Sequence, residues 1–237
     1  QDASTSYHHK SIGGYNAAKL RRYQDVIENQ FSRIDANGKS LGPNMEVLNM
    51  LNTKYLIVPD KNRQPVAQPN PNINGNAWFV DEIKWVNNAD EEMAALNDLD
   101  SKATAVIDKR FEKDLPGFNP DIDSAATIIL KSYEPNHVVY DSKTTLPSLA
   151  VFSEIYYQPG WKSFIDGKEM PHVRANYILR AMQVPAGDHT IEFKFRPETY
   201  YKGESISRIS SLAVLLLSVA GIGWLVWQNR KKKTATN

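Results

Sequence analysis

Hydrophobic and polar residues alternate with a period of two between Ala150 and Arg196, and this pattern predicts a series of short antiparallel β-strands. The alternation is clearest near the end of the stretch, where Ile191, Phe193 and Phe195 fall on one face. Turn signals separate five runs: Ala150–Tyr157, Trp161–Ile165, Lys168–Arg174, Tyr177–Val184 and His189–Arg196. We interpret this stretch as a β-meander that forms the centre of a β-rich domain.

The dipeptide Asp166-Gly167 lies between two of these runs and has the composition of a two-residue hairpin turn. A type I′ turn needs a positive φ at both central residues, and Asp-Gly adopts it at low steric cost. We therefore expect Trp161–Ile165 and Lys168–Arg174 to pair antiparallel.

The segment from Asn16 to Ser32 has a helical period instead. Apolar residues recur every three or four positions, which predicts an amphipathic helix with Asn16 as its N-cap. Three basic residues cluster on this helix: Lys19, Arg21 and Arg22. A solvated helix face is the expected interpretation of the cluster, and contact with phosphate or lipid headgroups is the alternative.

Between this helix and the meander the pattern predicts short elements. A helix at Met45–Leu51 leads into a strand at Lys54–Val58, whereas the polar, proline-rich segment Asn62–Gly75 is expected to be an exposed loop. Asn88 and Glu91 have the spacing of a helix-capping pair. Further strands are predicted at Trp78–Val80, Ile83–Val86, Thr104–Ile107, Thr127–Tyr133 and His137–Tyr140. So many short strands favour a β-sandwich or a partly open barrel.

The stretch Ile209–Trp227 contains 19 residues and no charged side chain. At about 1.5 Å per residue such a helix spans roughly 28 Å, the thickness of one bilayer core. A buried core helix is the alternative, but it would carry a polar stripe. We expect a transmembrane helix with Trp224 and Trp227 at the headgroup level. The basic residues that follow predict a cytoplasmic C-terminus and a membrane-anchoring role: Arg230, Lys231, Lys232 and Lys233.

These elements predict a mainly β (α+β) fold, an antiparallel β-sandwich-like domain with an N-terminal amphipathic helix and one C-terminal transmembrane helix. The expected division is an N-terminal helical segment at 1–42, an extracytoplasmic β-rich domain at 43–204, the transmembrane helix at 205–228 and a basic cytoplasmic tail at 229–237. Export of the domain across a membrane requires a removed signal peptide or further spans upstream of Gln1.

The amino-acid composition excludes several kinds of functional site. The formal net charge is +1, so no overall field favours nucleic acid, and the absence of cysteine removes disulfides, thiol nucleophiles and zinc-thiolate sites. Asp121 and Asp123 match a short Asp-x-Asp metal pattern, although turn formation is the more common role of such a pair. The histidines have no ligand spacing and are interpreted as surface or strand residues. We therefore predict no catalytic residue, no metal and no cofactor in this chain.

The densest aromatic group lies inside the meander and includes Tyr156 and Phe164. Aromatic side chains on a β-sandwich either fill the core or stack on sugar rings, and core packing is the default. The candidate ligand contacts are Trp161, Tyr157, Tyr177 and Arg180.

The ordered series of motifs in this region resembles the C-terminal part of the YfhO family of bacterial membrane proteins. The motifs are Ser153–Lys162, Ile165–Lys168, Arg174–Tyr177, Leu179–Ala181 and Val184–Gly187, preceded by Ser6–Tyr15, Lys19–Gln24, Leu48–Tyr55 and Gly75–Val80. The series covers nearly the whole chain.

The resemblance implies a multispanning protein of the bacterial cytoplasmic membrane, similar to glycosyltransferases that use polyprenyl-phosphate-sugar donors. Such enzymes are expected to carry their catalytic acids near the first membrane spans, outside this chain. The chain would then be a non-catalytic domain that assists glycosylation of a cell-envelope polymer. Its partners would be the lipid bilayer, the upstream transmembrane region and an envelope glycopolymer or lipid-linked sugar. The alternative is a free-standing, membrane-anchored β-sandwich module that binds carbohydrate or protein.

Overall fold

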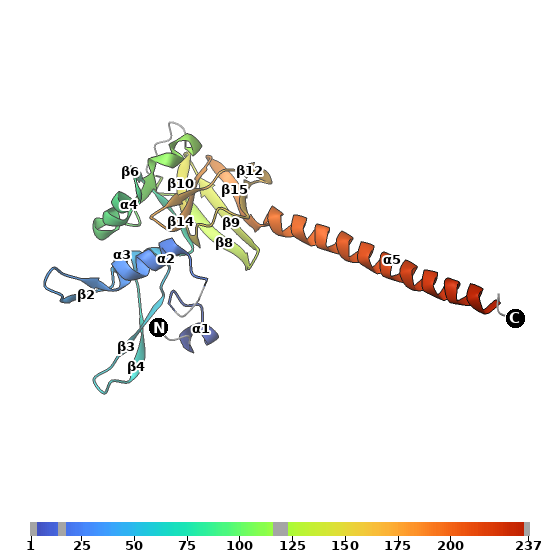
Figure 1. The fold of residues 1–237 in the computed structure, drawn as a ribbon. Helices are drawn as coiled ribbons and strands as arrows, with labels where there is room; N and C mark the ends of the chain where they lie inside the picture. The colour runs from blue at the N-terminus through green and yellow to red at the C-terminus, as the bar shows by residue number, and fades with distance from the viewer. Residues whose placement is uncertain (1–3, 14–17, 116–122, 235–237) are drawn as a thin grey trace. The chain divides into compact units, whose positions relative to one another are not determined.

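The computed structural model describes residues 4–13, 18–115 and 123–234. The chain forms two compact units, Gln1–Phe195 and Arg196–Asn237, coloured from blue to orange and from orange to red in Figure 1. The first unit contains the sheets and short helices, and the second contains one long helix. The strand-rich, mainly antiparallel architecture confirms the predicted fold class.

Two sheets form the body of the first unit. The six-stranded sheet has the order β5-β10-β14-β13-β7-β6, and the five-stranded sheet has the order β12-β11-β15-β9-β8. The strands of the six-stranded sheet are β5 (Ala77–Val80), β6 (Glu82–Val86), β7 (Thr104–Asp108), β10 (Ser148–Ile155), β13 (Val173–Ala175) and β14 (Leu179–Val184). Those of the five-stranded sheet are β8 (Thr127–Glu134), β9 (His137–Thr144), β11 (Trp161–Ile165), β12 (Lys168–Met170) and β15 (Gly187–Phe195).

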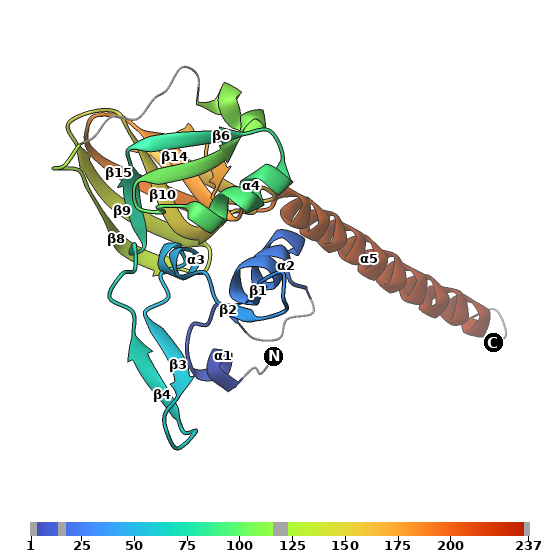
Figure 2. The ribbon, with the colours of Figure 1, turned by 90° about the vertical axis from the view of Figure 1, so that its left-hand side faces the viewer.

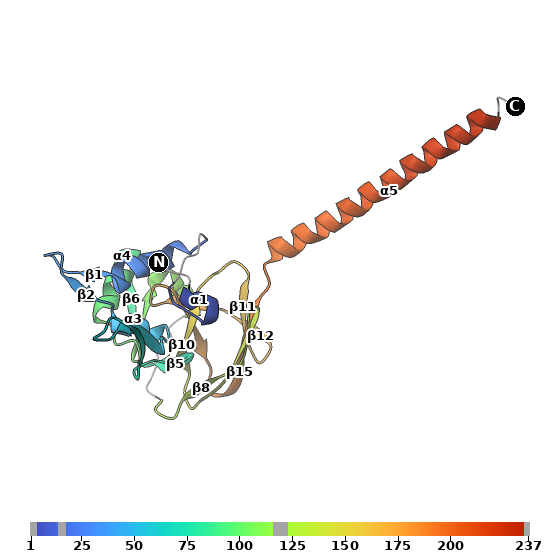
Figure 3. The ribbon, with the colours of Figure 1, turned by 90° about the horizontal axis from the view of Figure 1, so that it is seen from below.

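The six-stranded sheet is covered on both faces. Ala150 and Phe152 of β10 pack with Val138, Tyr140 and other residues of the five-stranded sheet. The intervening residues Leu149 and Val151 face the opposite way and join a second cluster with the short helices of the unit. Figures 2 and 3 show the resulting layers of helices, six-stranded sheet and five-stranded sheet. A strand buried on both faces explains why β10 has an almost continuous apolar sequence.

The predicted strands after Ala150 exist, but the prediction that they form one meander is wrong. The chain passes from β10 in the six-stranded sheet to β11 and β12 in the other, returns for β13 and β14, and leaves again for β15. Period-two alternation reports only that one face of a strand is buried. The alternation does not show whether the next strand pairs in the same sheet or belongs to the facing sheet.

The run Lys168–Arg174 shows the same limit. Lys168–Met170 pairs with β11 as expected, but Val173–Ala175 pairs with β14 in the other sheet, so the run is two strands and not one. The turn at its start is confirmed, since Asp166 and Gly167 have φ values of 50° and 78°.

The N-terminal helix is shorter than predicted. It consists of α2 (Arg21–Val26) followed by the π-helical turn η1 (Ile27–Phe31). Leu20 is extended with ψ 134°, so the helix begins at Arg21, and the predicted cap Asn16 lies outside the described residues. Tyr23 and Phe31 pack on the core as the pattern indicated, and Val26 is fully buried. A short α1 (Ser4–His8) precedes this helix, and β1 (Arg33–Ile34) and β2 (Ser40–Gly42) form a hairpin after it.

The basic cluster on this helix is not one solvated face. Arg21 forms an exposed ion pair with Asp25, at 2.9 Å. Arg22 instead turns towards the domain and forms an ion pair with the fully buried carboxylate of Glu92 at 3.0 Å.

The helix α3 (Met45–Met50) and the strand β3 (Tyr55–Pro59) confirm the next two predictions. The segment Asn62–Gly75 is not only a loop, because β4 (Pro65–Pro69) pairs with β3 along its whole length. Its prolines do not prevent pairing, since Pro59 and Pro65 oppose each other and neither needs to donate a ladder hydrogen bond. Asn70, which follows β4, is buried and donates to Oδ1 of Asn49 at 2.9 Å.

The helix α4 (Ala89–Ala95) begins with the predicted cap. The side chain of Asn88 accepts a hydrogen bond from the backbone N–H of Glu91 at 2.9 Å, and the carboxylate of Glu91 accepts one from the N–H of Asn87 at 2.8 Å. The helix and the 3-10 turn η2 (Leu96–Asp98) connect β6 to β7, which pair in parallel. The 3-10 helix η3 (Lys109–Asp114) follows β7 directly.

The second unit contains α5 (Glu198–Thr234), whose part Glu198–Gln228 has a mean hydropathy of 2.2 in its most apolar window and is long enough to cross a membrane. Its apolar side chains are exposed, as expected of a helix surrounded by lipid. The rings of Trp224 and Trp227 lie 5.2 Å apart near its end. The side chains of the predicted anchoring residues Arg230, Lys231, Lys232 and Lys233 lie outside the described part of the chain.

Candidate ligand-binding cleft

A cleft of about 670 Å³ opens in the first unit beside the start of β11. Its walls come from η3, from the turn between β10 and β11, and from β11, β12 and the residues after β12. The lining residues are Arg110, Phe111, Lys113, Asp114, Tyr156, Gln158, Trp161, Lys162, Ser163, Glu169, Met170, Pro171 and His172. Polar and charged side chains outnumber apolar ones among these residues, and Phe111, Tyr156 and Trp161 provide aromatic surfaces.

Trp161 is the predicted ligand contact that lines this cleft. It is the first residue of β11, half-buried, and its ring packs against Phe195 with 5.2 Å between the ring centroids. The guanidinium carbon of Arg180 lies 4.0 Å from the centroid of the Trp161 ring. A cation over a desolvated indole contributes about 2 kcal/mol. The structure thus brings two of the predicted residues together.

Arg180 supports Trp161 from inside the domain and does not line the cleft. Its side chain is almost fully buried between the sheets, and its Nε donates to the carbonyl oxygen of Ile155 at 3.1 Å. The strand β10 has a bulge between Phe152 and Ile155, next to this contact. Burial raises the pKa of the nearby Glu154 carboxyl, and the charge of Arg180 opposes that increase.

Tyr157 and Tyr177 lie away from the cleft lining. Tyr157 is exposed in the turn after β10, whereas its neighbour Tyr156 lines the cleft. Tyr177 is buried on the helix-covered side, where its hydroxyl donates to Oδ2 of Asp25 at 3.0 Å. Its backbone N–H donates to Oε1 of Glu92 at 3.1 Å. The polar groups of Tyr177 are therefore engaged in holding the N-terminal helix to the sheet.

The charges of the cleft walls are largely paired. Nε of Arg110 lies 2.8 Å from Oδ2 of Asp108, and Nζ of Lys162 lies 3.2 Å from Oε2 of Glu169. Lys113 and Asp114 add one charge of each sign. These pairs leave little net charge to attract an ion, and they present both hydrogen-bond donors and acceptors.

A buried arginine lies beneath two of the aromatic walls. The guanidinium carbon of Arg174 is 5.3 Å from the ring centroid of Phe111 and 6.0 Å from that of Tyr156. Nη2 of Arg174 forms an ion pair with Oε2 of Glu92 at 3.1 Å. Arg174 therefore connects the cleft walls to the buried carboxylate that also holds Arg22.

His172 lines the cleft, in contrast to the surface or strand role expected from the sequence. The hydroxyl of Ser163 donates to the carbonyl oxygen of Met170 at 2.6 Å, so the 2.8 Å contact between Ser163 Oγ and His172 Nδ1 requires His172 to donate. Nε2 is then an acceptor, and it is buried without a partner in the described part of the chain. Burial, aided by Arg180, lowers the pKa of His172 to about 4. The imidazole is therefore neutral near pH 7.

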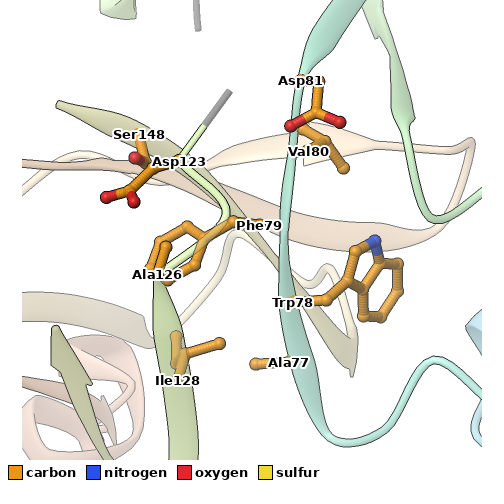
Figure 4. Close-up of a pocket in the computed structure, with 9 residues that line it drawn as sticks. All are labelled: Ala77, Trp78, Phe79, Val80, Asp81, Asp123, Ala126, Ile128 and Ser148. Carbon is orange, nitrogen blue, oxygen red and sulfur yellow. The ribbon is translucent and has the colours of Figure 1, made fainter. Parts of the chain in front are cut away.

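A smaller pocket of about 260 Å³ lies between β5 and the segment around Asp123. Figure 4 shows Phe79 and Ile128 facing each other across it, with Trp78 on the opposite side of β5. The Asp123 carboxylate accepts hydrogen bonds from the N–H of Ala125 and the hydroxyl of Thr145, at 3.1 Å and 2.9 Å, so it shapes a turn. Asp121 lies outside the described residues, and among those described no cluster of metal-ligating side chains is present.

A β-rich unit followed by a helix able to cross a bilayer defines the class of a membrane protein with a β-sandwich-like domain. Residues 116–207 match the family model of the bacterial membrane protein YfhO. This match confirms, for residues 116–207, the resemblance inferred from the sequence motifs. The chain matches no curated protein and no solved structure.

Proposed function

We propose that this chain is the non-catalytic, extracytoplasmic domain of a YfhO-like, glycosyltransferase-related multispanning membrane protein, and that it assists glycosylation of a cell-envelope polymer. In this proposal α5 anchors the domain in the bacterial cytoplasmic membrane. The upstream transmembrane region of the same protein supplies the catalytic groups. The observation that carries the proposal is the cleft at Trp161, with its aromatic walls and paired charges.

The chemistry of the cleft suits an uncharged saccharide. A sugar ring has an apolar face of C–H groups, which stacks on an aromatic ring such as Trp161, and a rim of hydroxyls that both donate and accept hydrogen bonds. The ion pairs Arg110–Asp108 and Lys162–Glu169 offer donors and acceptors at the cleft without a net charge. The neutral His172 ring adds surface to the wall without adding a charge.

The proposed orientation rests on charge. Arg230, Lys231, Lys232 and Lys233 follow Trp227 directly, and a basic cluster at the end of a span favours the cytoplasmic side. The domain before α5 would then face the outside, where envelope polymers are modified.

The cleft is tested by measuring binding of neutral oligosaccharide fragments of envelope polymers to the full chain in detergent micelles. Trp161→Ala should weaken binding about tenfold, equivalent to about 1.4 kcal/mol, and Trp161→Phe should have an intermediate effect because it keeps part of the stacking surface. Phe164→Ala is the matched control, since Phe164 lies on the same strand but does not line the cleft. Equal binding by all four proteins would reject the cleft as a saccharide site.

The accessory role is tested in membranes. The chain alone should transfer no sugar from a polyprenyl-phosphate donor, and in the full-length protein Trp161→Ala should reduce glycosylation while Asp121→Asn with Asp123→Asn should not. Donor-dependent transfer by the chain alone, abolished in the double Asp variant, would make this domain catalytic. Saccharide binding that depends on Trp161 without any effect on polymer glycosylation would instead favour the free-standing binding module.

A further inference from the structure

The hairpin of β3 and β4 projects from the two sheets as a two-stranded ribbon (Figures 1 and 2). Its base is fixed by Asn70, whose N–H donates to the carbonyl oxygen of Lys54 at 2.8 Å. At the other end the N–H of Asp60 donates to the carbonyl oxygen of Gln64 at 2.8 Å. An isolated two-stranded ribbon is only marginally stable in water, so a surface that packs on it would stabilise it.

Both faces of the ribbon are apolar. Side chains alternate along each strand, so one face carries Tyr55, Ile57 and Pro59 with their cross-strand partners Pro69, Ala67 and Pro65. The other face carries Leu56, Val58, Val66 and Gln68. Tyr55 is 63% exposed and Ile57 is 58% exposed, although such residues are normally covered. A contiguous exposed apolar surface of this kind marks an interaction site.

The prolines restrict how a partner can bind. Hydrogen-bonded and non-hydrogen-bonded residue pairs alternate along an antiparallel ladder. The backbone bonds at Asp60 and Asn70 mark two hydrogen-bonded pairs, so the pairs that contain Tyr55 and Ala67 are non-hydrogen-bonded. The backbone N–H and C=O groups of the residues on the first face therefore point away from the partner strand. On β4 these outward positions are Pro65, Ala67 and Pro69, and proline has no N–H to donate. The β4 edge therefore resists strand addition by another chain, which leaves the faces of the ribbon as the larger contact surface.

Positive charges lie at both ends of the ribbon. Lys54 precedes β3, and Lys61 and Arg63 lie in the turn between the strands. The turn has one acidic residue, Asp60, whose Oδ1 accepts from the N–H groups of Asn62 and Gln64 at 2.8 Å each. An apolar surface with a tyrosine and flanking cations complements the boundary between hydrocarbon and phosphate in an anionic membrane.

The chain carries its own candidate membrane span. Only Arg196 and Pro197 separate β15 from α5, the candidate membrane span. We propose that the β3–β4 ribbon is a second membrane contact, in which the face of Tyr55, Ile57 and Ala67 lies in the interfacial layer of the bilayer that α5 crosses and Lys61 and Arg63 meet anionic lipid headgroups. This contact does not depend on saccharide binding.

The absence of cysteine allows a direct test with the full chain reconstituted in vesicles. Ala67→Cys, labelled with an environment-sensitive fluorophore, reports on the proposed lipid-facing side, and Gln68→Cys reports on the opposite face of the same strand. In vesicles of phosphatidylcholine and phosphatidylglycerol, the label at position 67 should be quenched by a spin label on the lipid near the glycerol backbone and protected from aqueous iodide. The label at position 68 should show weaker lipid quenching and stronger iodide quenching.

Reversing the charges in the turn of the ribbon tests the proposed contact with anionic lipid. Lys61→Glu with Arg63→Glu should reduce lipid quenching at position 67 severalfold in anionic vesicles, and removal of phosphatidylglycerol should have a similar effect. Iodide quenching at position 67 equal to that at position 68, with no lipid quenching, would overturn the proposal. Protection that appears only at high protein-to-lipid ratio would also overturn it, because it would assign the face to a second copy of the chain.

Discussion

Arg174 and Glu92 form an ion pair inside the first unit, with Nη2 of the arginine 3.1 Å from Oε2 of the glutamate and both side chains buried. The same carboxylate holds Arg22 of α2 and the backbone N–H of Tyr177. One buried carboxylate thus fastens the N-terminal helix, α4 and the six-stranded sheet to one another. Such a group is costly to desolvate and is stabilising only while its partners are in place.

Glu92→Gln should therefore destabilise the domain strongly. The substitution removes the negative charge and leaves Arg174 buried without its main counter-ion, for which the expected loss is about 3–5 kcal/mol in the free energy of unfolding. Denaturant unfolding of the full chain in micelles measures it. Glu134→Gln, at an exposed position at the end of β8, is the control and should change stability by less than about 0.5 kcal/mol. Equal midpoints for the two variants would show that the carboxylate is dispensable.

The turn at Gly167 should tolerate asparagine but not valine. Its φ is 78°, and an added Cβ would meet no atom within 4 Å, so the cost comes from the backbone conformation alone. Gly167→Val should lose about 1 kcal/mol or more, because a β-branched residue resists positive φ. Gly167→Asn should lose less, since asparagine adopts the left-handed region more readily. Denaturant unfolding midpoints of the two variants measure this difference. An identical loss of stability in both would show that the cost does not come from the positive φ.

His172 should make the domain acid-sensitive. Its pKa in the folded protein is about 4, below the ordinary 6.5, so the folded state resists protonation. The stabilising contribution is fully present above pH 6.5 and is lost as the pH falls through 4. At about 1.4 kcal/mol per pKa unit the loss reaches about 3 kcal/mol.

Replacing His172 by a residue that does not titrate tests whether His172 causes the acid sensitivity. His172→Asn keeps an N–H able to donate to Ser163, and the difference in unfolding free energy between pH 7 and pH 4.5 should be smaller than in the wild-type chain. An unchanged difference would assign the acid sensitivity to other groups.

The membrane assignment of α5 predicts a change in solubility. A chain that ends at Tyr201 lacks the apolar span and should remain in the aqueous phase without detergent, whereas the full chain should require detergent for extraction. Phase separation in a detergent that clouds on warming measures both. Aqueous partitioning of the full chain would contradict a membrane-spanning α5.

Local rules predicted most elements of the fold. The type I′ turn at Asp166-Gly167 and the cap of α4 at Asn88 depend on neighbouring residues, and both appear as the sequence indicates. The parallel pairing of β6 with β7 and the alternation of β10–β15 between sheets depend on residues far apart in sequence. The hydrophobic pattern of a strand does not show which of the two sheets it joins, because the strand would bury the same face in either sheet.

Of the four candidate ligand contacts predicted from the sequence, only Trp161 lines the cleft. Tyr156, one residue before the candidate Tyr157, lines it instead; both residues follow the end of β10, so strand alternation does not decide which of them faces the cleft. Phe111 and His172 come from separate segments, and the approach of η3 to the sheet depends on its packing against β13 and β7. The pairing of Tyr133 on β8 with the cation of Lys10, at 3.7 Å from the ring centroid, was likewise invisible in the sequence.

The position of β15 has a consequence for biosynthesis. This strand is the last to be made, yet it lies between β11 and β9 in the five-stranded sheet. Both neighbours therefore present unpaired edges until Phe195 has been synthesised, and α5 begins at Glu198. Sheet closure and delivery of the apolar helix to the bilayer consequently fall in the same short interval of translation. Because non-local strand pairing is slow, an interval in which these edges stay open would expose the nascent domain to aggregation.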